Sequence, residues 1–129
     1  MKSIIDTVVT VVRGFAVDVG IDIETGFPRG GSRWNCGTWM DKMGESTRAG
    51  NRGIPSTPRD GAPVEIVGLA YSVAEWLSDL SENKKIEKNG FKVEHEFWTW
   101  KKWSQKIKNN FESKFWSDDG YFKGKYLFT

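Results

Sequence analysis

The chain has 129 residues, enough for one small domain with a modest hydrophobic core and too few for a two-domain enzyme. Its 19 Lys and Arg residues stand against 17 Asp and Glu residues, and this net charge of only +2 argues against a nucleic-acid partner. A composition of 28% charged and 38% hydrophobic residues excludes a disordered chain. The unusual counts are 7 Trp and 14 Gly, which suit a site that needs flat apolar rings and close backbone approach, as sugar binding does.

Several features predict a cytoplasmic protein with no membrane partner. Cys36 is the single cysteine, so no intramolecular disulfide or Cys-based zinc site can form, and a reducing compartment fits. The apolar segment Met1–Val12 is interrupted by Asp6 and lacks a small-residue cleavage site, which argues against a secretory signal. No apolar run approaches the roughly 18 residues of a membrane span.

Two kinds of periodicity divide the N-terminal part of the chain. Apolar residues recur at three- and four-residue spacing in Met1–Val12, which favours a buried helix, although the β-branched run at its end would also suit a strand. Apolar and polar residues then alternate over Val17–Ile23, the pattern of a strand with one wet face. Thr25 and Gly26 supply a turn and Phe27 starts a return strand, so we expect a short β-hairpin.

A long segment without periodicity, residues 34–61, follows this hairpin. It carries Trp34, Trp39, Met40 and Met43, which a linker would not need. A long loop rich in such residues is typical of a functional site.

The C-terminal half predicts two helices. Pro63 suits the first helical position, and one apolar face continues to a helix end near Asn83. The residues of that predicted face are Ile66, Leu69, Ala70, Val73, Trp76, Leu77 and Leu80. After a polar break at Lys84–Gly90, a second helix is expected from Phe97 to Trp116. Its apolar stripe comprises Phe97, Trp100, Trp103, Ile107, Phe111 and Phe115, with Lys101, Lys102 and Lys106 off it.

The second helix leaves two interpretations open. Five lysines accompany Glu112 as the one acidic residue, which would suit a helix lying on a membrane or in a partner's groove. Core packing is favoured, because Trp and Phe stripes at helical spacing usually face a core.

Most catalytic chemistries find no support in the sequence. The one histidine, His95, stands between Glu94 and Glu96, so a solvated charge run is favoured over a metal ligand or a catalytic base. The glycine-rich pieces at 30–31 and 50–53 do not match a phosphate-binding loop.

Carboxylates in or beside the aromatic segment are more informative. General acid catalysis on a glycosidic oxygen needs a carboxyl group that a partly apolar pocket keeps protonated. Trp39 and Met40 could provide that pocket for Asp41. Asp41 could instead cap a helix or pair with Lys42 or Arg48.

Asp60 and Glu65 also allow two interpretations each. Glu65 at the start of the first predicted helix could complement the helix dipole or bind sugar hydroxyls. Arg59 and Asp60 could form an ordinary turn pair, and spacing alone does not decide.

The residues around Trp39 and Asp41 resemble those of a known enzyme family. The run Arg33-Trp34-Asn35-Cys36-Gly37-Thr38-Trp39-Met40-Asp41 resembles the C-terminal amylo-α-1,6-glucosidase domain of eukaryotic glycogen debranching enzymes. The resemblance covers roughly Arg13 to Asn83 and is loose beyond. Its other matching stretches are Val17–Phe27, Lys42–Ser46, Asn51–Pro55, Thr57–Gly61 and Val64–Ile66.

The resemblance implies a fold, a reaction and roles. The fold is an (α/α)6 toroid, here partial, mainly α with the short β-hairpin near the N-terminus. The reaction is removal of the α-1,6-linked glucose stub of a glycogen limit dextrin with inversion, without metal or cofactor. Asp41 would be the general acid. The substrate-binding residues would be Trp39, Arg59 and Glu65, with Trp34, Asn35 and Asp60 at the rim.

The chain also departs from that family. The second carboxylate of an inverting pair comes there from a Gly-Pro-Glu-Trp stretch, which this sequence lacks. We expect one partial glucosidase domain over residues 1–129: an N-terminal segment and hairpin at 1–33, an active-site loop at 34–63, and barrel helices and a tail at 64–129. The alternative to catalysis on glycogen or another branched α-glucan is an incomplete fragment that binds carbohydrate or protein, through self-association or by docking to the missing barrel helices.

Overall fold

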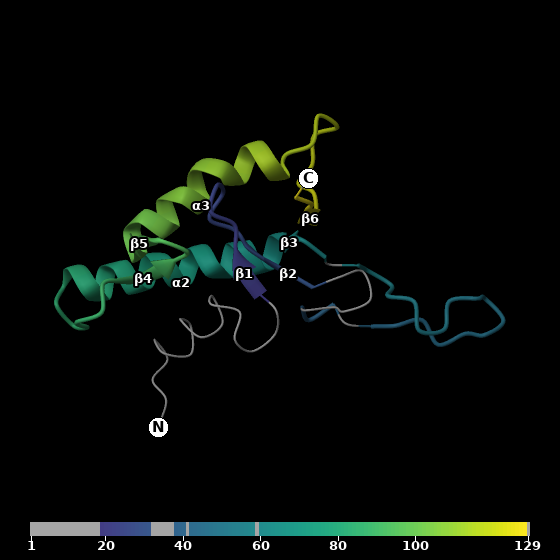
Figure 1. The fold of residues 1–129 in the computed structure, drawn as a ribbon. Helices are drawn as coiled ribbons and strands as arrows, with labels where there is room; N and C mark the ends of the chain where they lie inside the picture. The colour runs from purple at the N-terminus through teal and green to yellow at the C-terminus, as the bar shows by residue number, and fades with distance from the viewer. Residues whose placement is uncertain (1–18, 32–37, 41, 59, 129) are drawn as a thin grey trace, which may run out of the picture.

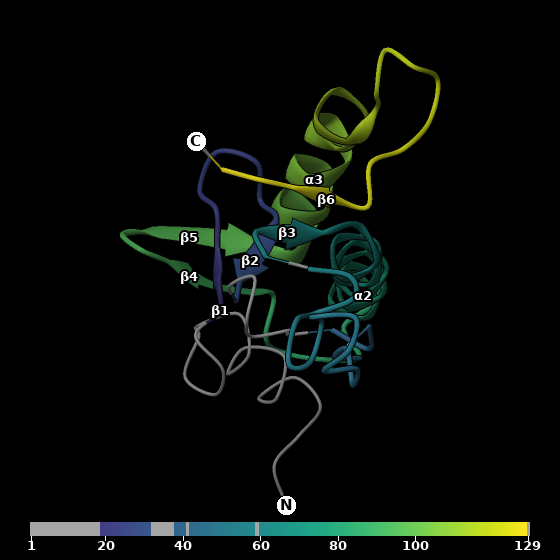
Figure 2. The same ribbon diagram turned by 90° about the vertical axis from the view of Figure 1, so that its right-hand side faces the viewer.

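The structure is a computed structural model, and it describes residues 19–31, 38–40, 42–58 and 60–128. The helix expected over Met1–Val12 lies outside these residues. In chain order the described elements are β1 (Val19–Ile21), β2 (Pro28–Gly30), β3 (Ala62–Pro63), α2 (Val64–Glu82), β4 (Gly90–Val93), β5 (Glu96–Thr99), α3 (Trp100–Phe115) and β6 (Lys125–Tyr126). The two helices lie one above the other, with the short strands on one side of them (Figures 1 and 2).

The N-terminal hairpin is confirmed. β1 and β2 pair antiparallel, with Val19 opposite Gly30 and Ile21 opposite Pro28. The turn between them is closed by Asp22, whose Oδ2 accepts from the backbone N–H and the hydroxyl of Thr25 at 2.8 and 2.7 Å. Phe27 is fully buried, so the hairpin anchors its turn in the core.

Helix α2 runs as its sequence predicts, but the helix begins one residue later. Pro63 is the N-cap, with extended backbone angles, and Val64 is the first helical residue. The helix ends at Glu82, and Asn83 is its C-cap. The backbone N–H and the side-chain amide of Asn83 both donate to the carbonyl of Asp79, at 3.0 and 2.7 Å.

The buried face of α2 agrees with the predicted face only in part. The buried residues are Val67, Ala74, Leu77 and Ser78, of which Leu77 belongs to the predicted stripe. Ala70 and Val73 of that stripe are partly buried against the core. Leu69 and Trp76, from the middle of that stripe, are 63% and 47% exposed. The reason is that α2 is apolar over a wider arc than one neighbouring helix can cover. In this structure α2 packs against α3, and Val67 is buried whereas Leu69 stays exposed.

The segment before α3 is a β-ribbon that the sequence analysis did not predict. β4 and β5 pair antiparallel, with Phe91 opposite Trp98. The predicted helix start at Phe97 is therefore wrong, and Phe97 is 51% exposed on β5. Thr99 caps the helix instead, because its Oγ1 accepts from the backbone N–H of Lys102 at 3.1 Å.

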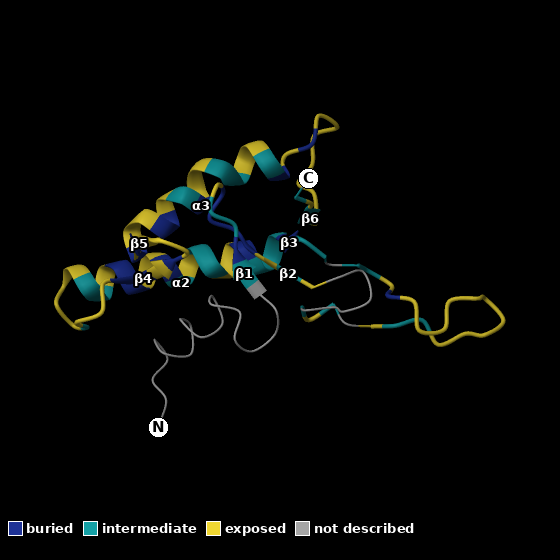
Figure 3. Cartoon of the chain, in the orientation of Figure 1, coloured by how far each residue is buried: buried dark blue, intermediate teal, exposed yellow. Residues whose placement is uncertain are grey.

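The buried stretches of the helices and ribbons are dark blue in Figure 3, and many of the core side chains are aromatic. Phe91 lies 5.2 Å from Trp100 and 5.1 Å from Trp103, centroid to centroid, and Phe27 lies 5.4 Å from Phe115. The stripe of α3 is thus a core stripe, as favoured over a membrane or groove helix. Neither helix of the described part has the length and apolar character needed to cross a membrane.

The C-terminal tail returns to the start of α2. β6 pairs antiparallel with β3, and Gly61, just before β3, forms a bridge to Gly30 of β2. The described chain therefore contains two helices and three two-stranded ribbons. This confirms a helix pair with an N-terminal hairpin, and shows more strand than the sequence analysis expected.

Candidate functional site

The predicted active-site loop folds back on itself. The backbone N–H of Ser56 donates to the carbonyl of Lys42 at 3.0 Å, and that of Gly44 donates to the carbonyl of Ile54 at 2.8 Å. Met43 and Pro55 form an antiparallel bridge. The two arms of the loop are thereby tied together directly after position 41. Figure 1 shows the loop running out away from α2 before it returns to β3.

Asp60 lies at the end of this loop and is held by the tail. Its Oδ1 pairs with Nζ of Lys125, from β6. The two side chains are 28% and 29% exposed, so most of the pair is shielded from water. The structure thus gives Asp60 a cationic partner from a distant part of the sequence.

Glu65 lies in the first turn of α2, five residues after Asp60. Both of its carboxylate oxygens are shielded from solvent. A negative charge there is favoured by the helix dipole, whose positive end is at this terminus. Residues 60–65 therefore place two carboxylates on one segment that joins the loop to α2.

The other predicted site residues are placed only in part. Trp39 is 74% exposed, so its ring face is open to a ligand. Asp41, Arg59, Trp34 and Asn35 lie outside the described residues. Their roles beside Asp60 and Glu65 therefore stay predictions.

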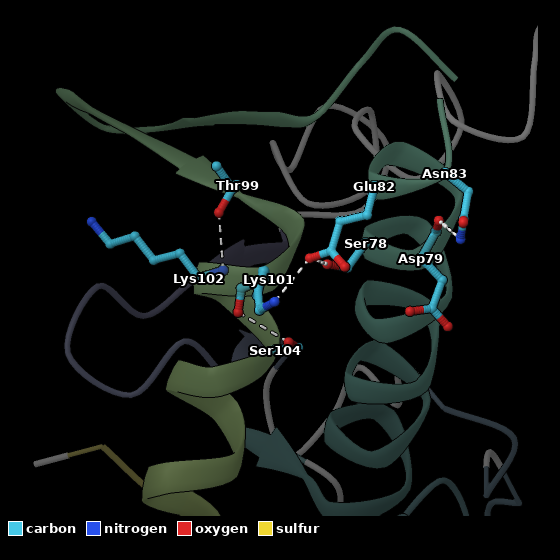
Figure 4. A network of polar contacts seen from close by, with 8 residues as sticks. All are labelled: Ser78, Asp79, Glu82, Asn83, Thr99, Lys101, Lys102 and Ser104. Atoms are coloured by element: carbon cyan, nitrogen blue, oxygen red, sulfur yellow. Dashed lines mark hydrogen bonds and ion pairs between the residues drawn. The ribbon is translucent and has the colours of Figure 1, made fainter. Parts of the chain in front are cut away.

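Ion pairs outside this segment shift the pKa values of some of their members. A hydrogen bond and the charge of Lys101 lower the pKa of Glu82, and the same pair raises the pKa of Lys101. Figure 4 shows the pair, with Nζ of Lys101 2.9 Å from Oε1 of Glu82, as it joins the start of α3 to the end of α2. On β5, hydrogen bonds from Trp98 and Lys102 lower the pKa of Glu96. These pairs connect elements and lie on the surface.

No metal centre is found where the structure describes the chain, since no three His, Cys, Asp or Glu side chains gather there. His95 is exposed at the turn between β4 and β5, as expected for a solvated charge run.

Comparison with known proteins decides the family. The sequence profile of the amylo-alpha-1,6-glucosidase family matches residues 1–127. The chain belongs to the amylo-alpha-1,6-glucosidase family. It is 42% identical over 111 residues to the glycogen debranching enzyme of Saccharomyces cerevisiae. That alignment covers 81% of this chain and 7% of the yeast protein, so the chain spans a small part of its relative. The family match also includes α3 and the tail, beyond the limit of Asn83 that the motifs suggested.

Lys125 is the site neighbour that the sequence analysis missed. A lone lysine in an aperiodic tail carries no motif, and its place beside Asp60 follows only from the pairing of β6 with β3. The alternation of Gly90, Phe91, Lys92 and Val93 was a usable signal for the missed ribbon.

Proposed function

We propose that this chain carries the glucose-binding and acid-donating part of an amylo-α-1,6-glucosidase. Its substrate would be the α-1,6-linked glucose stub of a glycogen limit dextrin, hydrolysed with inversion. The observation that carries the proposal is the family match over residues 1–127 together with the Trp39-Met40-Asp41 motif.

Asp41 is the proposed general acid. Protonation of a glycosidic oxygen requires a carboxyl group that holds its proton near neutral pH. Trp39 and Met40 directly precede Asp41 in the sequence, and they would supply the apolar surroundings that this role requires.

The remaining residues form the proposed glucose subsite. The open ring of Trp39 offers an apolar platform for a sugar face. Arg59 and Glu65 would supply charge-assisted hydrogen bonds to hydroxyl groups, with Trp34, Asn35 and Asp60 at the rim. The Glu65 oxygens are shielded from solvent in the structure, so sugar binding by Glu65 would require them to become accessible.

The base of the inverting reaction is proposed to come from outside this sequence. Inversion requires a second carboxylate roughly 6.5 to 9.5 Å from the acid, with a water between them. The Gly-Pro-Glu-Trp stretch that would carry it is absent here. We accordingly propose that residues 1–129 are one partial domain of an (α/α)6 toroid.

Glucose release tests this proposal. The chain is incubated with limit dextrin, alone and with a debranching-enzyme fragment that supplies the Gly-Pro-Glu-Trp stretch. Replacement of Asp41 by Asn should abolish release with little change in circular dichroism, whereas Asp119→Asn, an exposed aspartate on the tail, should leave release unchanged. Release that is equal in the Asp41→Asn variant and the parent chain would refute the assignment of the acid.

The exposed face of α2 favours a second candidate function, a non-catalytic interaction module. Leu69 and Trp76 are 63% and 47% exposed on one side of α2, and contiguous apolar surface of this kind promotes association. Sedimentation velocity of the parent and of a Leu69→Asp, Trp76→Asp variant tests it. A parent chain that stays monomeric at high concentration would remove self-association as the explanation.

A further inference from the structure

The C-terminal tail makes three kinds of contact with the segment that enters α2. The strand pair β3–β6 sets Ala62 opposite Tyr126 and Pro63 opposite Lys125. The backbone N–H of Val64, the first residue of α2, donates to the carbonyl of Gly124 at 3.0 Å. This N–H is one of those that have no acceptor inside a helix, so the tail satisfies it.

Lys125 adds a charged contact to these backbone bonds. Its ammonium group pairs with Oδ1 of Asp60, and both side chains are largely shielded. A charge-assisted bond that is shielded from water is stronger and better directed than one on an open surface. The pair therefore fixes the direction of the Asp60 carboxylate as well as the position of its backbone.

The other side of the same segment is held by β2. The backbone N–H of Gly30 donates to the carbonyl of Gly61 at 3.0 Å. Gly61 also permits the close approach of β6, because a Cβ at this position would lie 2.4 Å from the carbonyl oxygen of Tyr126. Residues 60–64 thus lie between β2 and β6, and Figure 2 shows β6 beside β3 at the start of α2.

We propose that β6 is a positioning strand of the glucosidase site and that Lys125 is its positioning residue. Lys125 orients Asp60 at the rim of the glucose subsite, and the β3–β6 pair fixes the start of α2, from which Glu65 projects. The inference rests on the proposed function for the identity of the ligand. It assigns a role to the C-terminal tail, which carries no motif of its own.

Two measurements on the full chain test this inference. The first is hydrogen exchange of the Gly30 and Val64 amides, which reports how firmly residues 60–64 are held. The second is the affinity for panose, a trisaccharide that ends in an α-1,6-linked glucose. The variants are Lys125→Met, which removes the charge, Lys125→Arg, which keeps it, and Lys123→Met, an exposed lysine on the same tail as the matched control.

The inference predicts a specific pattern. Lys125→Met should raise the exchange rate of both amides and weaken panose binding by about tenfold, the order expected for one charge-assisted hydrogen bond. Lys125→Arg should restore both properties, and Lys123→Met should change neither. Rescue by arginine separates a positioning role from a general loss of stability, which urea denaturation of each variant also monitors.

Three results would overturn the inference. In the first, Lys125→Met changes neither property. In the second, exchange rises while panose affinity stays constant, which would make the contact structural only. In the third, affinity falls while exchange stays constant, which would mean that Lys125 binds the sugar directly. If the parent chain binds no panose, the proposed function fails instead, and amide exchange still decides whether Lys125 fixes residues 60–64.

Discussion

Among single residues, two glycines near the candidate site differ in whether the structure leaves room for a side chain. Gly61 has φ near +80° and lies so close to Tyr126 that a side chain would collide with its carbonyl oxygen. Gly68, in the middle of α2, has open space where a side chain would be. One glycine is required by the backbone, whereas the other weakens the helix that contains it.

This contrast predicts opposite effects of alanine. Gly61→Ala should lower the free energy of unfolding by roughly 1–3 kcal/mol, because it places a side chain in the left-handed region and against β6. Gly68→Ala should raise it by roughly 0.5–1 kcal/mol. Urea denaturation measures both, and a Gly61→Ala variant as stable as the parent chain would show that β6 does not approach β3 this closely.

Trp103 gives a second prediction at this scale. Its ring is 1% exposed and its Nε1–H donates to the carbonyl of Gly26 at 2.8 Å, across 77 positions of the sequence. Trp103→Phe leaves that buried carbonyl without its donor and should cost about 1–3 kcal/mol. The same change at Trp76, which is 47% exposed, should have little effect. Equal unfolding midpoints for both variants would contradict the structure.

Among the secondary-structure elements, the helices could be predicted from their apolar periodicity, whereas elements that depend on strand pairing could not. Both helices carry a repeated apolar stripe, so their existence was predictable. The start of α3 was not, because Phe97 lies three residues before Trp100 and fits the helical stripe, although it belongs to β5. Which part of the α2 apolar face is buried could be predicted only in part. The apolar arc of α2 is wider than one neighbouring helix covers, so the packing of the other elements selects the part that is buried.

The ion pair between the helices gives a prediction on pH. The pKa of Glu82 is lowered in the folded chain, mainly by its hydrogen bond from Lys101, so the unfolded chain binds this proton more readily. The stabilisation is therefore complete above the ordinary value of 4.5 and is lost as the pH falls through the lowered pKa. Because the pair is exposed, the effect is small and weakens with salt.

Denaturation of Glu82→Gln as a function of pH measures this contribution. The variant should be less stable than the parent chain at pH 7, and the difference should shrink as the pH falls below 4.5. Glu112→Gln, at an exposed glutamate of α3, controls for the loss of one negative charge. A difference that stays constant from neutral to acidic pH would contradict the assignment.

For the molecule as a whole, the Trp39-Met40-Asp41 motif was sufficient to recognise the family, but it could not predict which residues lie next to the candidate site. The Trp-Met-Asp run consists of neighbouring residues, so the sequence alone is enough to recognise it. The contact between Asp60 and Lys125 joins positions that are 65 apart, and no local pattern could show it. The exposed apolar residues Leu69 and Trp76 on α2 are consistent with our proposal that residues 1–129 form a partial glucosidase domain.

We propose that this chain holds a glucose subsite at the loop and the start of α2. Titration of isotope-labelled chain with panose, followed by NMR, maps where the sugar binds. We expect shifts of the Trp39 indole, of the amides at 60–65 and of Lys125, with the amides of β4 and β5 unchanged. Shifts confined to other surfaces, or none at saturating panose with a folded chain, would rule out a glucose subsite at this place.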